Sequence, residues 1–118
     1  MQIRLTRRAL LDIEAIEAAS IARHGALATE QYLAKLELSL TTIGAHPGLL
    51  RKRGVSKNLR IYGSADHILV CAVIEETIYV TAVWYGSMNI EQKLIELEPG
   101  LVEEAEILHR RLQQSCNR

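Results

Sequence analysis

The chain has 118 residues, of which 48% are hydrophobic, and its 14 basic side chains balance its 14 acidic ones. This length allows one domain with its own core but not two. Charge interrupts the apolar runs well before the roughly 18 residues of a membrane span, and Met1–Leu5 is too short and too charged for a signal peptide. Cys71 lies in an apolar run and Cys116 near the chain end, which predicts free thiols in a reducing cytoplasm.

The first segment predicts a short strand, Gln2–Leu5, followed by a helix. Thr6 is a good N-cap residue because its hydroxyl can accept from free amides of the first turn. The helix is predicted over Arg7–His24, and Gly25 is its natural stop because glycine tolerates a left-handed conformation. Asp12 lies mostly off the apolar stripe. The stripe repeats at a spacing of three to four residues through Ala9, Ile13, Ile16 and Ser20, widened by Leu10.

A second helix is predicted from Ala28 or Thr29 to about Ala45. Its apolar stripe contains Tyr32, Leu33, Leu36, Leu40 and Ile43. The connection between the two helices is only a few residues long, so we expect them to fold back as an antiparallel hairpin. His46-Pro47-Gly48 ends the second helix, because Pro47 disfavours helix at the residue before it.

A basic loop, Leu49–Asn58, leads into three predicted strands: Leu59–Ser64, His67–Ile74 and Ile78–Tyr85. The last two form a β-hairpin, since they are rich in β-branched and aromatic residues and are separated by a short polar break. Alternation places Ile78, Val80, Ala82 and Trp84 on one face of the last strand. The order β-α-α-β-β-β favours an α+β fold with a mainly antiparallel sheet and the helical hairpin packed on it.

The residues after Tyr85 are predicted to form a helical extension. Gly86-Ser87-Met88-Asn89 is a break, Ile90–Leu97 can form a short helix, and Pro99-Gly100 interrupts it. A final helix then covers Leu101 to about Gln113, with an apolar seam through Leu101, Ala105, Leu108 and Leu112. We therefore divide the chain into a domain at 1–89 and an extension at 90–118. The seam must be buried on the chain's own sheet or across a homodimer.

The charges are unevenly distributed although the total is zero. Five cations and no acid occupy a ten-residue stretch, which contains Arg51, Lys52, Arg53, Lys57 and Arg60. Six glutamates crowd a later stretch, which contains Glu91, Glu96, Glu98, Glu103, Glu104 and Glu106. These runs are either solvated surfaces that neutralise one another or a basic patch for an acidic partner.

No motif for metal or cofactor binding is visible. The four histidines occur in different predicted elements, and neither cysteine belongs to a C-x-x-C motif. There is no phosphate-binding loop and no nucleophile elbow. His67 is interpreted as a strand-start residue rather than a base, and Trp84 and Tyr85 as core and rim residues rather than a stacking platform.

The order of these elements resembles the ParE/RelE superfamily, the toxins of bacterial type II toxin–antitoxin modules, over most of Met1–Asn89. The similarity is closer to the ParE branch, which includes plasmid-stabilisation toxins, because of the Asp12-Ile13 helix phrase and the His46-Pro47 helix end. The matching phrases are an opening strand, Ala9–Ile16, Tyr32-Leu33 with Leu36, Ile43–Gly48, Leu59-Arg60, Asp66–Val73 and Ile78–Gly86.

The resemblance implies a small sheet with an N-terminal helical hairpin packed across it. It also implies an antitoxin as partner and DNA gyrase as the target of ParE-like toxins. The RelE branch instead implies cleavage of mRNA on the ribosome, with basic side chains that stabilise the phosphate transition state. Ribonuclease members place an arginine just inside the central strand and basic residues after the last strand, where this chain has Ile68, and Ser87 with Met88. This difference favours a toxin that acts by binding, and whether the chain is an enzyme stays open.

Two sets of candidate residues follow. Arg60 and Tyr85 are the catalytic candidates of the ribonuclease alternative, although a lone tyrosine with a pKa near ~10 is a poor catalyst at neutral pH. For partner binding we expect Arg51, Lys52, Arg53 and Arg60 to meet an acidic antitoxin segment or the target. For Arg60 the structural alternative is an ion pair with an acid of the C-terminal segment. A third alternative is an inactive relative whose antitoxin groove is covered by its own C-terminal segment.

Overall fold

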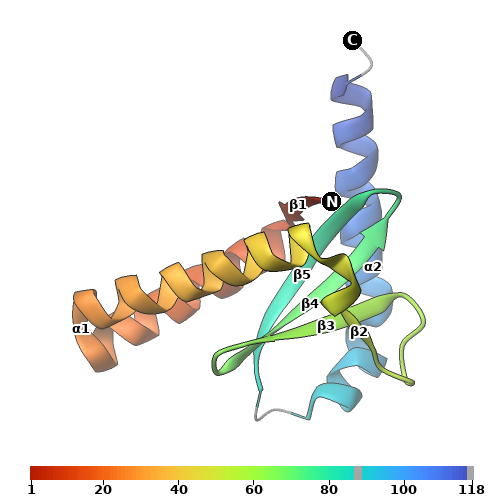
Figure 1. Cartoon of the computed structure of the whole chain (residues 1–118). Coiled ribbons are helices and arrows are strands. Elements are labelled where there is room, and N and C mark those ends of the chain that lie inside the picture. The colour runs from red at the N-terminus through yellow and green to blue at the C-terminus, as the bar shows by residue number, and fades with distance from the viewer. Residues whose placement is uncertain (87–88, 117–118) are drawn as a thin grey trace.

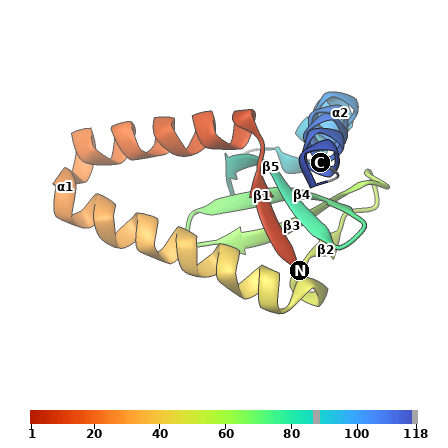
Figure 2. The same ribbon diagram turned by 90° about the horizontal axis from the view of Figure 1, so that it is seen from above.

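The computed structural model describes residues 1–86 and 89–116. A sheet lies between a long helical hairpin on one face and a single helix on the other (Figures 1 and 2). The elements are β1 (Gln2–Leu5), α1 (Arg7–Ala45), a 3-10 turn (Pro47–Leu49), β2 (Arg51–Lys52), β3 (Leu59–Ser64), β4 (His67–Ile74), β5 (Thr77–Tyr85) and α2 (Ile90–Cys116). The predicted α+β class is confirmed.

The sheet is mixed, with the strand order β1-β5-β4-β3-β2. Strands β5, β4, β3 and β2 pair antiparallel, as a meander predicts, whereas β1 lies parallel to β5 and pairs Gln2 with Thr77 and Leu5 with Val80. The first strand therefore completes the sheet beside the last one. β2 lies within the predicted basic loop, because two charged residues at a sheet edge carry no alternation that identifies a strand.

α1 consists of two helical arms that meet at Gly25, and Figure 2 shows the reversal between them. Gly25 has φ 85° and ψ 171°, a combination that is essentially restricted to glycine. The Thr29 hydroxyl, which lies near the reversal, donates to the Gly25 carbonyl oxygen at 2.9 Å. The predicted stop and hairpin are confirmed, but the second arm begins directly after Gly25 rather than at Ala28 or Thr29.

The Gly25→Ala variant is expected to lower the free energy of unfolding by about 1–3 kcal/mol, because a Cβ strains this backbone conformation. Gly100→Ala provides a control of opposite sign. Gly100 lies inside α2 with open space around it, so alanine there should stabilise the fold by about 0.5–1 kcal/mol. Urea unfolding of both variants measures the difference, and equal effects would contradict the role given to Gly25.

The face of the sheet beneath α1 holds one of the two hydrophobic clusters. Its buried members are Ala9, Leu36, Ile43, Leu50, Leu69, Cys71, Ile78, Val80 and Val83. Thr6 is the N-cap as predicted, and its hydroxyl accepts from the Ala9 amide at 3.3 Å. Leu10 does not widen the buried stripe, because its side chain is 47% exposed.

Asp12 attaches α1 to the open edge of β5. Pairing with β1 ends at Val80, so the amide of Val83 would otherwise have no strand partner on that side. The Asp12 carboxylate accepts from this amide at 2.9 Å, which replaces a missing ladder bond with a charge-assisted one. Asp12 therefore has a structural role although it lies off the apolar stripe, because its carboxylate binds the backbone of β5.

A β-bulge at Thr81 interrupts the register between β4 and β5. Val70 pairs with Ala82 and Cys71 pairs with Val80, so Thr81 has no partner in β4. Its hydroxyl donates to the Val70 carbonyl oxygen at 2.9 Å. One extra residue in a strand reverses the alternation of every side chain beyond it.

The prediction that Ile78, Val80, Ala82 and Trp84 share one face is therefore wrong. Ile78 and Val80 belong to the cluster under α1, whereas Ala82 and Trp84 belong to the cluster under α2. The faces of β5 divide as Ile78, Val80 and Val83 toward α1, and Tyr79, Ala82 and Trp84 toward α2.

α2 is one continuous helix that covers the second face of the sheet. Pro99 lies inside it and does not end it, so the predicted interruption at Pro99-Gly100 is wrong. Pro99 is exposed, and water can reach the backbone carbonyl that proline leaves without a donor. The buried seam contains Ile90, Leu94, Leu101 and Ala105, which pack on Leu59, Val70, Ala72, Tyr79, Ala82 and Trp84.

The seam of the C-terminal helix thus packs on the chain's own sheet, which is the first of the two predicted arrangements. Leu97, Leu108 and Leu112 extend the same contact as partly buried neighbours. Within the described residues, no helix has a stretch long and apolar enough to cross a membrane.

Candidate functional site

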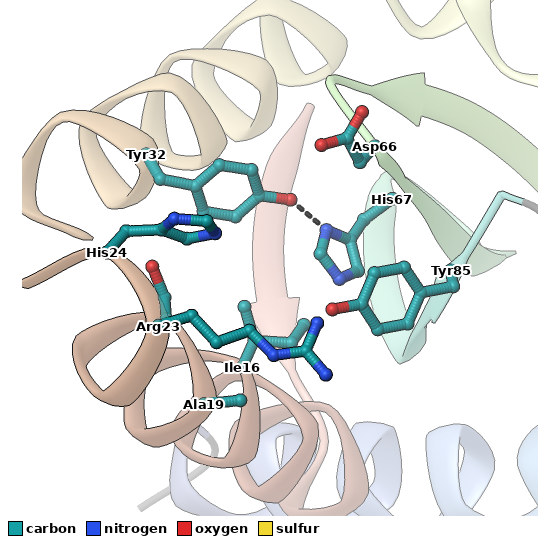
Figure 3. Close-up of a pocket in the computed structure, with 9 residues that line it drawn as sticks. Ile16, Ala19, Arg23, His24, Tyr32, Asp66, His67 and Tyr85 are labelled. Carbon is teal, nitrogen blue, oxygen red and sulfur yellow. Dashed lines mark hydrogen bonds between the residues drawn. The ribbon is translucent and has the colours of Figure 1, made fainter. Parts of the chain in front are cut away.

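A cavity of about 90 Å³ lies between the two arms of α1 and the turn side of the sheet. Figure 3 shows its polar side chains converging from α1, from the start of β4 and from the end of β5. The lining residues are Ile16, Ala19, Ser20, Arg23, His24, Tyr32, Asp66, His67 and Tyr85. The register explains the meeting, because His67 and Tyr85 are direct cross-strand partners.

Tyr32 and His67 are joined by a hydrogen bond between the tyrosine hydroxyl and Nδ1 of the imidazole. Burial, helped by the nearby charge of Asp66, raises the pKa of Tyr32 to about 12, so the hydroxyl keeps its proton. Burial lowers the pKa of His67 below its ordinary value, although the Asp66 carboxylate acts in the opposite direction. Both groups are therefore neutral near pH 7.

The second nitrogen of His67 has no hydrogen-bond partner in the described part of the chain. Nε2 is buried without a hydrogen bond to any described residue, and the His67 residue is only 4% exposed. We assign the Tyr32 hydroxyl as the donor and Nδ1 as the acceptor, since the hydroxyl meets no other acceptor among the described residues. In this tautomer the imidazole carries its hydrogen on Nε2. A buried N–H donor without an acceptor is costly and unusual in a folded protein.

Tyr85 and Arg23 complete the donor side of this cavity. The rings of His67 and Tyr85 lie with centroids 4.3 Å apart and planes 39° apart. In Figure 3 the Tyr85 hydroxyl points to the side where the Arg23 guanidinium lies, and the His67 imidazole lies beside both groups. In the described part of the chain, Arg23 forms no ion pair.

A second feature is a pair of cations on neighbouring strands at the sheet edge. Lys52 of β2 and Arg60 of β3 are direct cross-strand partners, so two like charges stand side by side. Neither forms an ion pair with a described residue, and the same holds for Arg51. Arg53 differs, since its guanidinium lies 3.7 Å from the Glu91 carboxylate of α2.

Arg60 does not form the predicted alternative ion pair with the C-terminal segment. It borders a cleft between the sheet and α2 that Glu106 also lines, yet no Arg60–carboxylate pair forms in the described residues. The acidic segment thus neutralises Arg53 alone among the four partner-binding candidates.

The two catalytic candidates lie in different places. Tyr85 lines the cavity beneath α1, whereas Arg60 lines the cleft beside α2. Ile68, at the position where ribonucleases have an arginine, packs partly buried against the α2-side cluster. Ser87 and Met88 lie outside the described residues.

Two further sites with ionisable groups have structural roles, the contacts of His109 and the buried Cys71. Tyr79 meets Nδ1 of His109 at 2.5 Å, and Nε2 of His109 lies 3.3 Å from the Glu75 carboxylate, which fixes α2 to the β4–β5 turn. Burial raises the pKa of the Cys71 thiol to about 12, so it is no nucleophile. In the part of the chain that the structure describes, no three histidine, cysteine or acidic side chains gather as metal ligands would.

Sequence reasoning missed most of the cavity beneath α1. The sequence pattern places Tyr32 on an apolar stripe and His67 at the start of a strand, and it assigns no functional role to Arg23 or Asp66. The available signal was the hairpin register, which places His67 opposite Tyr85. The helical hairpin then brings Arg23 and Tyr32 above that pair (Figure 3).

Comparison with known proteins finds a matching family model and solved structures of similar fold. Residues 3–90 match the family model described as the ParE toxin of the type II toxin-antitoxin system, parDE. A solved chain described as "Chromosomal ParDE TA system from P. aeruginosa" is similar with a TM-score of 0.64. It is 16% identical, and the match covers 72% of this chain and 95% of that one, so it supports the fold. No curated protein sequence matches.

Proposed function

Because the chain belongs to the ParE toxin family of type II toxin–antitoxin systems, we propose that it is a cytoplasmic toxin that acts by binding proteins. Its first partner is a cognate antitoxin that neutralises it, and its target is DNA gyrase. The observation that carries this proposal is the unneutralised cation pair Lys52 and Arg60, together with Arg51, on the edge of a sheet with the family's fold.

The cation pair supports binding because it is unfavourable for the isolated fold. Like charges that face each other across two strands destabilise a sheet by a few tenths of a kcal/mol. An acidic segment laid along β2 and β3 would remove this repulsion and steer association electrostatically. β2 is also an edge strand, so its outer backbone groups can receive an extended partner segment.

RNA cleavage is not part of the proposal. Its two candidate residues, Arg60 and Tyr85, line separate cavities. The cavity that contains Tyr85 measures about 90 Å³, well below the roughly 300 Å³ at which ligand pockets begin. The volume of this cavity therefore gives no support to a nucleotide-binding site at Tyr85.

The Lys52→Glu variant is expected to separate stability from binding. Glutamate opposite Arg60 turns a repulsive pair into an attractive one, so the free energy of unfolding should rise by about 0.2–1 kcal/mol. The affinity for the antitoxin should fall about tenfold, mainly through slower association. Surface plasmon resonance against the co-expressed product of the adjacent reading frame measures the second effect, and urea unfolding the first.

Arg110→Glu is the matched control, since it makes the same charge change at an exposed site on α2. It should leave both quantities nearly unchanged. A Lys52→Glu protein that binds the antitoxin as tightly as the parent would refute the role of the cation pair. Gyrase is tested separately by a DNA supercoiling assay with the purified chain, in which undiminished supercoiling would exclude that target.

A further inference from the structure

We propose that the cavity beneath α1 binds a carboxylate, held by Arg23, by the Nε2–H group of His67 and by the Tyr85 hydroxyl. These three groups line one cavity from three elements of the fold. The inference does not rest on the proposed toxin function, because the cavity lies apart from the Lys52–Arg60 pair and can be titrated in the isolated protein.

The donor set is the first argument. His67 Nε2 is buried without a partner among the described residues, and in the tautomer assigned above, with the Tyr32 hydroxyl donating to Nδ1, it carries the hydrogen. A donor in this state requires an acceptor from outside the described chain. The cavity therefore presents an oriented hydrogen-bond donor, for which an oxygen atom is the matching acceptor.

The geometry of the other two donors specifies the kind of acceptor. Figure 3 shows the planar guanidinium of Arg23 and the Tyr85 hydroxyl directed at the same space as the imidazole. A guanidinium offers two parallel N–H groups that match the two oxygens of a carboxylate, and each oxygen can accept a second bond. One carboxylate can thus satisfy all three groups at once.

The charges that line the cavity and the volume of the cavity restrict the chemical class of the ligand further. Asp66 also lines the cavity, so its negative charge disfavours a ligand with more than one negative charge. A phosphate group carries about −1.5 to −2 at pH 7, whereas a carboxylate carries only one charge, which Arg23 balances. About 90 Å³ holds roughly three waters at ≈ 30 Å³ each, which suits one functional group rather than a whole metabolite.

The experiment is a titration of the full chain followed by NMR of the His67 imidazole, using ¹⁵N-labelled histidine. Sodium acetate represents a free acid, and N-acetylglutamate α-amide represents an acidic side chain of a protein. Inorganic phosphate and sodium chloride are compared at matched ionic strength. Acetate is expected to shift the Nε2 resonance with saturation in the millimolar range, and phosphate to bind at least fivefold more weakly.

Arg23→Gln is expected to weaken acetate binding about tenfold, because a charge-assisted bidentate contact is lost. Arg7→Gln is the matched control, since Arg7 is an exposed arginine of the same helix outside the cavity, and it should change the affinity less than twofold. If the glutamate analogue binds at least as tightly as acetate, the natural carboxylate is a protein side chain. If acetate alone binds, it is a free acid.

Three results would overturn the inference. The first is an acetate shift that stays linear in concentration, as non-specific binding gives. The second is an equal effect of Arg23→Gln and Arg7→Gln. The third is tighter binding of phosphate than of acetate, which would remove the carboxylate assignment.

Discussion

A chain truncated after Asn89 is expected to lose its fold. α2 supplies Ile90, Leu94, Leu101 and Ala105 to the cluster on the second face of the sheet. Burial of each large apolar side chain contributes about 1.5–3 kcal/mol, and a domain of this kind has a total stability of only about 5–15 kcal/mol. The truncated chain would also expose Trp84 and its neighbours as one apolar patch, which promotes aggregation.

Circular dichroism and size-exclusion chromatography of the 1–89 fragment beside the full chain measure this effect. We expect loss of cooperative unfolding and a large soluble or insoluble aggregate. A monomeric fragment that unfolds cooperatively would support the division into a domain at 1–89 and a dispensable extension. It would also show that residues 1–89 fold without α2.

Leu101→Ala is expected to lower the free energy of unfolding by about 2–5 kcal/mol. The Leu101 side chain is 1% exposed in the centre of the α2 seam, and truncation to alanine removes its buried methyl groups and leaves a cavity. The effect on helix propensity is small, since leucine and alanine are both good helix formers.

Ile95→Ala is the control for this prediction because Ile95 lies in the same helix and is 53% exposed. Its expected effect is within about 0.5 kcal/mol. Urea denaturation with a shared m-value gives both numbers. Two equal, small effects would mean that α2 is not held against the sheet in solution.

The order of elements was predictable because each one carries a local signal. Thr6 can cap a helix, Gly25 can reverse one, and the apolar strand runs are separated by short polar turns. The stripe of α2 is also present in the sequence, since the steps of four and seven residues between Ile90, Leu94 and Leu101 keep all three on one helical face across Pro99. The prediction that Pro99 interrupts the helix is wrong, because a proline on the exposed side of a helix leaves a carbonyl that water can satisfy.

Sheet pairing and side-chain faces were not predictable in the same way. Alternation in β5 assumes an unbroken strand, and the unpaired Thr81 changes its phase. The parallel partner of β1 has no sequence signal, because a four-residue strand fits any open edge of suitable length.

To predict the cavity beneath α1, one would need the strand pairing, the side-chain faces and the reversal of the helical hairpin. His67 and Tyr85 become neighbours through register, and Arg23 joins them only because α1 turns back at Gly25. Charge counting could identify Lys52 and Arg60 as basic residues. It could not show that Arg53 meets Glu91 while the other two lack a carboxylate partner among the described residues.

The parallel pairing of β1 with β5 has a consequence for the time course of synthesis. The bond between Thr6 and Val80 joins positions 74 residues apart, so β1 leaves the ribosome long before its partner exists. Such non-local closure slows folding. The nascent chain therefore stays without its complete sheet until β5, which ends at Tyr85, has been translated.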